Sequence, residues 1–581
     1  MIEKIKEKKL IIFWAVVFIL LNYLSYYFRF TYNMNILPAF NNLFSEPQLL
    51  LRGFPISFNI ADLSISFFTT CILFLIWKEK KDNRDRFKRG EEHGSAKWGN
   101  IKKINNYISD SKNELNNFII SQNLEVALDD SDKPFEYRIN KNCIVVGGSG
   151  SGKTRCFVKP NLLQCNSSFV CTDPKGTIIN EIGYALRKKK YKLKVFNTVD
   201  FSKSMKYNPL VYIRKEQDIL SLVETIIANT DGAKASEQKQ DFWVKAEKLL
   251  YQAYISLIIT KFPKEEQHLG TLIDLVRYST VREDDEDFKN AIDLLFDKLE
   301  EEDPEHFAVK QYRAFKLSAG KTTKSILISC AARLSPLNIP DFRELISEDD
   351  IDFENLGNKG QKTGMFVVIS DTDPTFNFIV SIMYSQMFNR LCFIADNKYK
   401  GSLPTHVRFM LDEFANIGLI PNFEKLITTI RSRNISATLI LQAQSQLKAI
   451  FKDSWETIIG NCDTTIFLGG KEDSTVKKLT EDLGKETIYD ENVSITRSNS
   501  SSSSKATSKL GVELMAKNKL LTMSKKKCIV QVLGYDPVID DKFDLEKHRL
   551  FQYHSKGNQR WFDLGKYISH FKNSKVRVTT V

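Results

Sequence analysis

The stretch VVGGSGSGKTRCFV, residues 145–158, decides how the rest of the sequence is interpreted. It contains the full pattern Gly147-x-x-x-x-Gly152-Lys153-Thr154, with apolar residues before it and an apolar segment after it. Between a strand and a helix, such glycines let the backbone close around an anion, and the loop N–H groups point at phosphate oxygens. An ordinary Gly/Ser turn would not require the lysine and the threonine. The pattern therefore predicts a phosphate-binding loop.

This loop is typical of a site for a nucleoside triphosphate, with ATP and Mg²⁺ as the expected cofactors. Lys153 is expected to reach the β- and γ-phosphates, and Thr154 is expected to hold Mg²⁺. The predicted nucleotide-binding residues are Gly147, Gly148, Ser149, Gly150, Ser151, Gly152, Lys153, Thr154 and Arg155.

A second segment, VRFMLDEFANIG at 407–418, places two carboxylates at the end of an apolar run. Taken alone, such a run is also a common way to start a helix. A phosphate loop, however, needs an acidic partner on a neighbouring strand, so we assign Asp412 to Mg²⁺ and Glu413 to polarising the attacking water. The next apolar run ends at Gln442, where a side chain is placed to sense the γ-phosphate.

Two arginines, Arg431 and Arg433, lie between these two runs. An arginine supplied by a neighbouring subunit can stabilise transition-state charge in phosphoryl transfer. We take Arg433 as the catalytic candidate, although a solvated surface arginine is the commoner role for either residue singly.

Eight short apolar runs after residue 140 predict the strands of one sheet. They lie at 142–148, 167–173, 192–200, 365–370, 407–413, 436–442, 464–470 and 528–534. Near-continuous apolar runs that alternate with helices are typical of a parallel sheet buried on both faces. Between 215 and 355 the pattern is helical and too long for a loop. We therefore predict an α/β domain in two parts, 90–214 and 356–550, with an inserted all-α domain at 215–355.

The first 89 residues read as a membrane anchor. Residues 10–28 carry no charge and are long enough to cross a bilayer, and the run at 56–77 contains only Asp62 near its outer end. This carboxylate is either tolerated there or makes a packing or pore contact. Lysines and arginines precede the first span and follow the second, whereas the loop between them has only Arg29 and Arg52. The positive-inside rule then predicts a two-pass protein of the plasma or inner membrane, with both termini and the bulk of the chain cytoplasmic.

Composition narrows the function classes further. The net charge of +12 suggests a polyanion or a membrane surface as partner, although membrane-flanking lysines and an AT-rich genome explain it equally well. The nine cysteines contain no Cys-x-x-Cys pair and the seven histidines are scattered, so disulfides and a zinc site are not expected. Residues 494–509, SITRSNSSSSSKATSK, are low in complexity and predict a mobile segment. The tail at 551–581 is basic.

Taken in order, the motifs resemble those of the type IV coupling proteins, the TraG-like membrane ATPases of conjugation and type IV secretion. The resemblance rests on the two-span N-terminus and on several boxes spread over nearly the whole chain. These are HGSAKWG at 93–99, GGSGSGKT at 147–154, DPKG at 173–176, YNPL at 207–210, DFWVKAEKLL at 241–250, SDTDP at 370–374, LDEFANIG at 411–418 and ILQAQSQL at 440–447. The match weakens after about residue 480.

The resemblance implies a RecA-like P-loop motor domain with an inserted all-α domain, anchored in the membrane lipid as a homohexamer. It also implies ATP hydrolysis coupled to the delivery of a relaxase–single-stranded DNA complex, or of a protein, into the channel subunits of a type IV secretion system. The residues themselves support only a membrane-tethered P-loop ATPase.

Three alternatives stay open at this point. An FtsK-like translocase of duplex DNA shares the motor fold but normally carries four spans and a winged-helix end domain. A nucleotide-switched substrate receptor would bind ATP without motor activity, and Glu413 and Gln442 favour turnover over that. A coupling protein that handles only protein cargo cannot be separated from a conjugative one by sequence.

Overall fold

The computed structural model describes residues 2–32, 56–86, 91–230, 237–282, 288–318, 320–496, 502–558 and 560–579. The chain divides into two compact units. One unit joins Met1–Ser95 to Gly484–Val512, and the other joins Ala96–Leu483 to Glu513–Val581. The residues Arg52, Lys88 and Arg89, on which the charge argument partly rested, lie outside the described residues.

The larger unit is built on a nine-stranded sheet with the order β13-β12-β9-β3-β8-β7-β4-β6-β5. All eight predicted strands are present in it, as β3 (Cys143–Val146), β4 (Ser168–Asp173), β5 (Lys192–Asn197), β6 (Thr363–Val368), β7 (Val407–Leu411), β8 (Ile435–Leu441), β9 (Thr464–Phe467) and β12 (Lys527–Val532). A ninth strand, β13 (Val538–Asp541), pairs antiparallel with β12, and β12 pairs antiparallel with β9. The sheet is therefore parallel from β9 to β5 and antiparallel at one edge, which corrects the purely parallel expectation.

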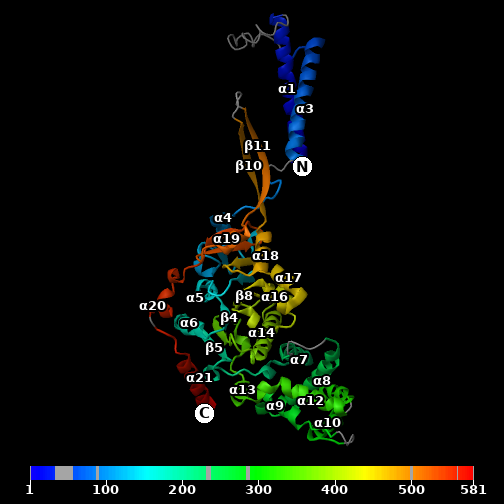
Figure 1. Ribbon diagram of the computed structural model, residues 1–581, viewed down its shortest axis with the longest axis vertical. Helices are drawn as coiled ribbons and strands as arrows, with labels where there is room; N and C mark the ends of the chain where they lie inside the picture. The colour runs from blue at the N-terminus through cyan, green and yellow to red at the C-terminus, as the bar shows by residue number, and fades with distance from the viewer. Residues whose placement is uncertain are drawn as a thin grey trace. The chain divides into compact units, whose positions relative to one another are not determined.

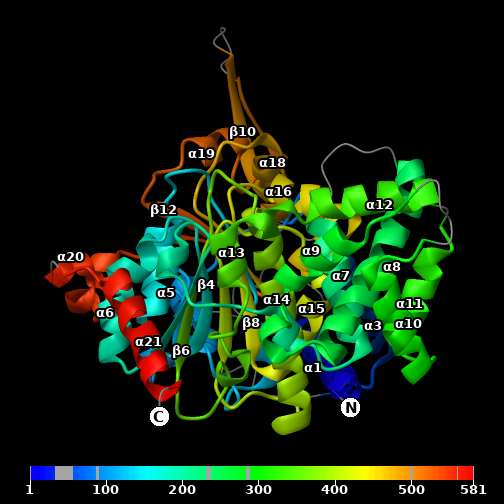
Figure 2. The same ribbon diagram turned by 90° about the horizontal axis from the view of Figure 1, so that it is seen from below.

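Helices cover both faces of this sheet, as the sequence predicts. Helices α5 (Lys159–Leu163) and α6 (Thr177–Lys188) lie on one side of the strands, and α14 (Asn377–Lys398) and α15 (Phe423–Thr429) lie on the other (Figure 2). The chain moves from β3 through β4 to β5 in one direction and returns from β6 through β7 and β8 to β9. Right-handed crossovers then place the helices of the two passes on opposite faces. Helix α14 is apolar enough to span a membrane, but 72% of its most apolar window is buried, so it is a core helix.

Between β5 and β6 the described residues form helices and no strand. These are η5 (Phe201–Lys203), η6 (Pro209–Tyr212), α7 (Glu216–Thr230), α8 (Glu237–Lys261), η7 (Lys264–Glu266), α9 (Leu269–Tyr278), α10 (Ala291–Glu302), α11 (Phe307–Lys316), α12 (Gly320–Arg333), η8 (Ser335–Asn338), α13 (Pro340–Leu345) and η9 (Phe353–Asn355). Arg333 of α12 binds Glu247 of α8 at 2.8 Å and Thr230 at the end of α7, which ties three of these helices together.

Two long helices open the smaller unit, α1 (Ile2–Tyr32) and α3 (Ile60–Arg86). Their apolar parts, Leu10–Arg29 and Ile60–Lys80, are long and apolar enough to cross a membrane, so the second span begins later than predicted. Asp62 is fully buried and accepts hydrogen bonds from Arg29, Ser25 and Ser57. The carboxylate is therefore a packing contact between the two helices, one of the two roles left open by the sequence.

The Ser-rich segment overlaps two paired strands. Strands β10 (Lys485–Thr496) and β11 (Ser502–Glu513) pair in a two-stranded sheet, so the described residues of the segment at 494–509 lie in strands rather than in an irregular linker, and its mobility stays a prediction (Figure 1). Backbone pairing does not require apolar side chains, and composition alone therefore hides such a ribbon. Within the same unit, Lys509 forms an ion pair with Glu92, and Ser95 pairs with Glu486.

The basic C-terminal tail is folded against the larger unit. Helix α21 (Leu564–Thr579) follows α20 (Ser555–Asn558), and Tyr567 of α21 donates a hydrogen bond to the Leu193 carbonyl on β5, 3.0 Å away. Lys575 forms ion pairs with Glu348 and Asp350, at 2.7 and 2.8 Å. Because β5 is the last strand of the sheet, the tail covers an edge that would otherwise be exposed.

Candidate nucleotide-binding site

The glycine-rich loop leaves the carboxyl end of β3, as the motif requires. Gly150 and Gly152 have φ values of 73° and 92°, which side chains with a Cβ rarely adopt, so these glycines are needed for the shape of the loop. A π-helical turn, η4 (Lys153–Val158), then runs into α5. Pro160 of α5 lacks the N–H that would continue an α-helical ladder back to Cys156, which gives the wider turn a local cause.

Lys153 lies folded back on the loop that it serves. Its Nζ donates to the carbonyl oxygen of Gly147 at 2.7 Å, and the side chain is buried. Burial lowers the pKa of the Lys153 ammonium, while Asp412 and Glu413 nearby oppose that shift. Among the described residues, the Lys153 ammonium therefore donates hydrogen bonds only to backbone carbonyl oxygens of the loop.

Thr154 and Asp412 meet although 258 positions separate them. The Thr154 hydroxyl donates to Oδ2 of Asp412 at 2.8 Å. Asp412 is buried, which raises the pKa of its carboxyl group, while the Thr154 hydrogen bond and Lys153 oppose the rise. Strand β8 lies between β3 and β7, so Asp412 is not on the neighbouring strand that the sequence argument assumed. The two oxygens nevertheless meet across the end of β8.

Glu413 and Gln442 lie at the same carboxyl ends of the strands, just after β7 and β8. Glu413 has a φ of 52°, a strained value for a residue with a long side chain, and its Oε2 accepts a hydrogen bond from Asn416 at 3.0 Å. Gln442, at the end of β8, approaches Oε1 of Glu413 with its Nε2 at 3.4 Å. Strand β8 thus places the glutamine between the phosphate loop and the carboxylates. The sequence missed Asn416, because nothing in the LDEFANIG box marks it as the residue that orients Glu413.

Arg433 lies elsewhere, before the amino end of β8. Its guanidinium binds Asp396 through two nitrogen atoms, at 2.9 and 2.8 Å, and donates to the Thr429 carbonyl. Arg431, two residues earlier in η11 (Ile430–Arg433), is exposed. Both arginines therefore lie at the amino ends of the strands, whereas the phosphate loop lies at the carboxyl ends.

A model of the family described as type IV secretory system conjugative DNA transfer matches residues 97–559. The chain belongs to this family.

Curated relatives agree with this family. A VirD4 protein of Rhizobium radiobacter is 25% identical over 422 residues, which cover 71% of this chain and 57% of the relative. A VirD4 protein of Agrobacterium fabrum is 23% identical over 469 residues, covering 78% and 65%. A conjugal transfer protein TraG of Rhizobium radiobacter is 21% identical over 318 residues, covering 53% and 46%. The chain thus matches less than two thirds of the length of these relatives.

Solved structures of the coupling protein TrwB share the fold. A TrwB structure in complex with sulphate has a TM-score of 0.55 at 13% identity and covers 78% of this chain and 95% of its own. Another, in complex with the ATP analogue ADPNP, has a TM-score of 0.53 at 12% identity and covers 77% and 93%. At these identities the likeness shows the architecture alone, a RecA-like P-loop fold.

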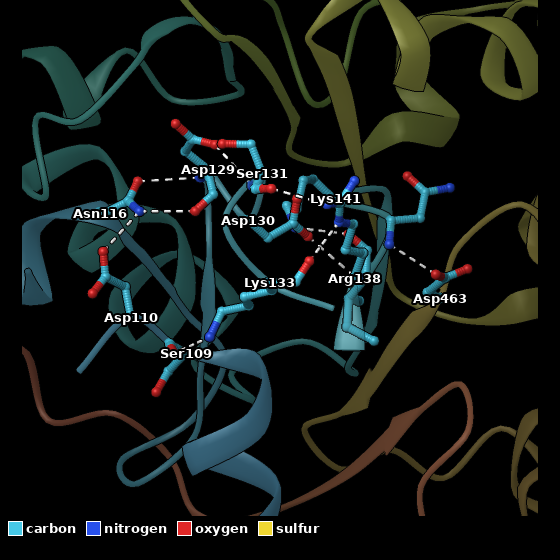
Figure 3. A network of polar contacts seen from close by, with 12 residues as sticks. Ser109, Asp110, Asn116, Asp129, Asp130, Ser131, Lys133, Arg138, Lys141 and Asp463 are labelled. Carbon is cyan, nitrogen blue, oxygen red and sulfur yellow. Dashed lines mark hydrogen bonds and ion pairs between the residues drawn. The ribbon is translucent and has the colours of Figure 1, made fainter. Parts of the chain in front are cut away.

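The amino ends of the strands, opposite the phosphate loop, form a hollow that we call the basic hollow. A cavity of about 720 Å³ opens at the amino ends of the strands. Its lining includes four basic side chains, two carboxylates and one imidazole, which are those of Arg138, Lys141, Lys362, Arg431, Asp129, Asp130 and His406. Lys141 forms an ion pair with Asp130, and Arg138 donates to the carbonyl oxygens of Lys133 and Ser131, 2.9 Å away in both cases (Figure 3). These contacts hold the 129–141 loop beside the hollow.

Two buried residues belong to this region, His406 in the lining of the hollow and Arg408 two positions later on β7. His406 bonds Asn434 and Ser436 at 2.7 and 2.8 Å, and burial, aided by Arg408, lowers the pKa of its imidazole to about 3. Arg408 is itself buried, with its guanidinium 3.7 Å from the ring centre of Phe118. No motif in the sequence predicts this hollow, because its lining comes from loops far apart in the chain.

Proposed function

We propose that this protein is a membrane-anchored ATPase that receives a relaxase–single-stranded DNA complex and couples ATP hydrolysis to its delivery into a type IV secretion channel. Membership of the conjugative DNA transfer family supports the cargo. The observation that carries the ATPase part is the 2.8 Å hydrogen bond between Thr154 and Asp412, which joins the phosphate loop to a buried carboxylate at one edge of the sheet.

The residues present fit ATP and Mg²⁺. The Ser151 hydroxyl in the loop is buried with no hydrogen-bond partner among the described residues, which suits a loop built to meet phosphate oxygens. Thr154 and Asp412 offer the hydroxyl and carboxylate oxygens that Mg²⁺ prefers, and they would hold it. The bound cation would neutralise charge on the phosphates.

The remaining steps belong to the chain's own groups. The loop amides and Lys153 bind the phosphates. Glu413, oriented by Asn416, positions the attacking water and accepts its proton at a carboxylate oxygen. Gln442, beside Glu413, links this carboxylate to β8 and therefore to movement of the strand end.

We also propose a homohexameric ring in which an arginine of one subunit completes the site of the next. A head-to-tail ring brings one face of each subunit against a different face of its neighbour. Arg433 is the residue expected from sequence, but it is bound to Asp396. Arg431 is exposed on the basic hollow, which supports it as the better candidate.

The same proposal covers domains and topology. Residues 215–355 form an inserted all-α domain of the motor, residues 1–89 form the anchor, and residues 551–581 form a C-terminal tail. Both termini face the cytoplasm, consistent with the two N-terminal apolar helices and the lysines and arginines beside them.

The test is steady-state ATPase activity of the full-length protein in a membrane mimetic. It is measured without DNA, with single-stranded DNA and with duplex DNA, and Lys153→Ala serves as the blank. We expect activity that single-stranded DNA stimulates and that the blank lacks. Stimulation by duplex alone would favour an FtsK-like translocase.

Conjugative transfer in cells separates a motor from a switch. Glu413→Gln should bind ATP, because the phosphate loop and the magnesium ligands remain, and it should fail to transfer DNA. Normal transfer by this variant would overturn the motor and support a nucleotide-switched receptor. ATPase activity with transfer of protein but not of DNA would limit the cargo to protein.

A further inference from the structure

Lys542, which lies 391 positions after Ser151 of the glycine-rich motif, contacts the backbone of the phosphate loop. Lys542 directly follows β13, the antiparallel edge strand, and is buried. Its Nζ donates to the carbonyl oxygen of Ser151 at 2.8 Å and to that of Leu468 at 2.7 Å. We propose that Lys542 is a positioning residue that holds the phosphate loop in its anion-binding conformation. This inference rests on the proposed nucleotide site.

The hydrogen bond from Lys542 to the Ser151 carbonyl also fixes the direction of the next N–H group. In a trans peptide the C=O and the following N–H point in opposite directions, and no described peptide bond is cis. A Ser151 carbonyl held by Lys542 therefore turns the Gly152 N–H away from Lys542. Gly152 is the second fixed glycine of the motif, so its N–H is one of the amides that the phosphate needs. Lys542 thus sets the direction of a phosphate-binding donor without touching the phosphate.

The peptide between Ser151 and Gly152 is free to rotate unless a contact restrains it. The φ of 92° at Gly152 and of 73° at Gly150 place glycine on both sides of Ser151. Glycine populates left- and right-handed φ values about equally, so the intervening backbone can rotate at small energetic cost. A rotated peptide would present the Ser151 carbonyl oxygen, rather than an N–H, to an anion. A charge-assisted hydrogen bond from a buried ammonium opposes that rotation.

The second acceptor connects the loop to the sheet. Leu468 follows β9, its N–H donates to the Val146 carbonyl at 2.8 Å, and the Gly469 carbonyl accepts from the Gly148 N–H at 2.8 Å. Lys542 therefore joins the glycine loop to the end of a strand that already lies beside it. Burial lowers the pKa of the Lys542 ammonium, and Cys156 and Cys528 near it oppose the shift. Two well-placed carbonyl oxygens offset the cost of burying this cation.

The experiment measures nucleotide affinity of the full-length protein in lipid nanodiscs by titration calorimetry. The ligands are ATP, ADP and AMP, each with Mg²⁺. Lys542→Met removes the charge and both hydrogen bonds at similar length, Lys542→Gln keeps a donor, and Lys542→Arg keeps a cation. Lys547→Met, an exposed lysine five positions later, is the matched control.

We expect Lys542→Met to weaken ATP and ADP binding by about 10- to 100-fold, the effect of losing charge-assisted hydrogen bonds. AMP affinity should change less than threefold, because AMP lacks the phosphate that the loop amides hold. Lys542→Arg should recover most of the loss, and Lys547→Met should match the wild type. The ratio of ADP to AMP affinity is the readout that a general loss of stability would not change.

Three outcomes decide the matter. Equal ADP affinities for the wild type and a folded Lys542→Met would overturn the inference. An equal loss for AMP and ADP would also overturn it, because Lys542 would then act on stability alone. If Lys542→Met does not fold, the same comparison is made with Lys542→Gln. A wild type that binds no nucleotide would instead refute the proposed ATPase, which keeps the two failures distinct.

Discussion

The two edges of the central sheet are built in different ways. At the carboxyl edge, the glycine loop and the carboxylates come from two short motifs, and Thr154 meets Asp412 across β8. At the amino edge, the basic hollow is assembled from loops between residues 116 and 435, none of which has a motif. A glycine loop shaped for phosphate requires particular residues at consecutive positions, whereas a hollow lined by separate loops requires only that their side chains come together in the fold.

The comparison has a functional meaning if the two edges face each other in a ring. Phosphates held at one edge would then meet the cations of the other edge, supplied by the next subunit.

Removal of a key cation at either end of the strands should abolish ATP hydrolysis. We expect Lys153→Ala and Arg431→Ala each to lower the rate of ATP hydrolysis by about 10³-fold or more, since the first removes a phosphate ligand and the second a transition-state cation. Mixing the two variants before assembly should restore part of the activity, because some interfaces then combine an intact loop with an intact arginine. ATPase assays of the mixture check this. Recovery with Arg433→Ala but not with Arg431→Ala would return the role to Arg433.

Loss of the Glu413 carboxylate, the proposed proton acceptor, should lower the rate of ATP hydrolysis without weakening ATP binding. Glu413→Gln keeps a side chain that Asn416 can still orient, but it cannot accept a proton, so the hydrolysis rate should fall by about 10²- to 10⁴-fold. Titration with ATP should give an affinity within about threefold of the wild type. Asn416→Ala should cause a smaller loss of rate, and an unchanged rate would remove the orienting role from Asn416.

At the amino edge, an ion pair should contribute stability rather than catalysis. Asp130→Asn leaves the half-buried ammonium of Lys141 without its anion, and we expect a loss of about 1–3 kcal/mol in the free energy of unfolding. Chemical denaturation of the full-length protein measures this. Asp132→Asn, in the same loop, is the control. An unchanged midpoint for Asp130→Asn would show that the pair does not hold the 129–141 loop.

The two edges should also respond to pH with opposite signs. At the amino edge, burial lowers the pKa of His406 to about 3 from an ordinary value of 6.5, so the unfolded state binds the proton more readily. This residue therefore supports stability above pH 6.5, and its contribution is lost as pH falls from 6.5 toward 3. His406→Gln should make the unfolding midpoint less sensitive to acid in that window. An identical pH profile would contradict the assignment.

At the carboxyl edge, Asp173 should give the smallest effect and the reverse sign. Burial raises the pKa of its carboxyl group to about 6, although the N–H groups of Thr177, Ile178 and Ile179 stabilise the carboxylate. The folded state then binds the proton more readily between pH 4 and 6, so Asp173 lowers stability as pH rises through that window. Asp173→Asn should flatten the dependence of the unfolding temperature on pH in that window, which thermal unfolding at several pH values measures.

The sequence determined what short-range pattern can determine. Apolar runs predicted all eight of their strands, because a parallel sheet buried on both faces demands continuous apolar segments. The glycine loop and the LDEFANIG box predict Lys153, Thr154, Asp412 and Glu413 as site residues, because phosphate chemistry fixes residue types at fixed spacing. The structure brings Thr154 and Asp412 together.

Only the tertiary structure decided the rest. Strand order placed β8 between the loop and Asp412, and the antiparallel edge brought Lys542 beneath Ser151. The described residues of the Ser-rich segment pair as parts of β10 and β11. Arg433 binds Asp396 of α14, which lies 37 positions earlier in the chain. These features depend on which distant segments pack together, and that is set by the burial of the whole core rather than by any local pattern.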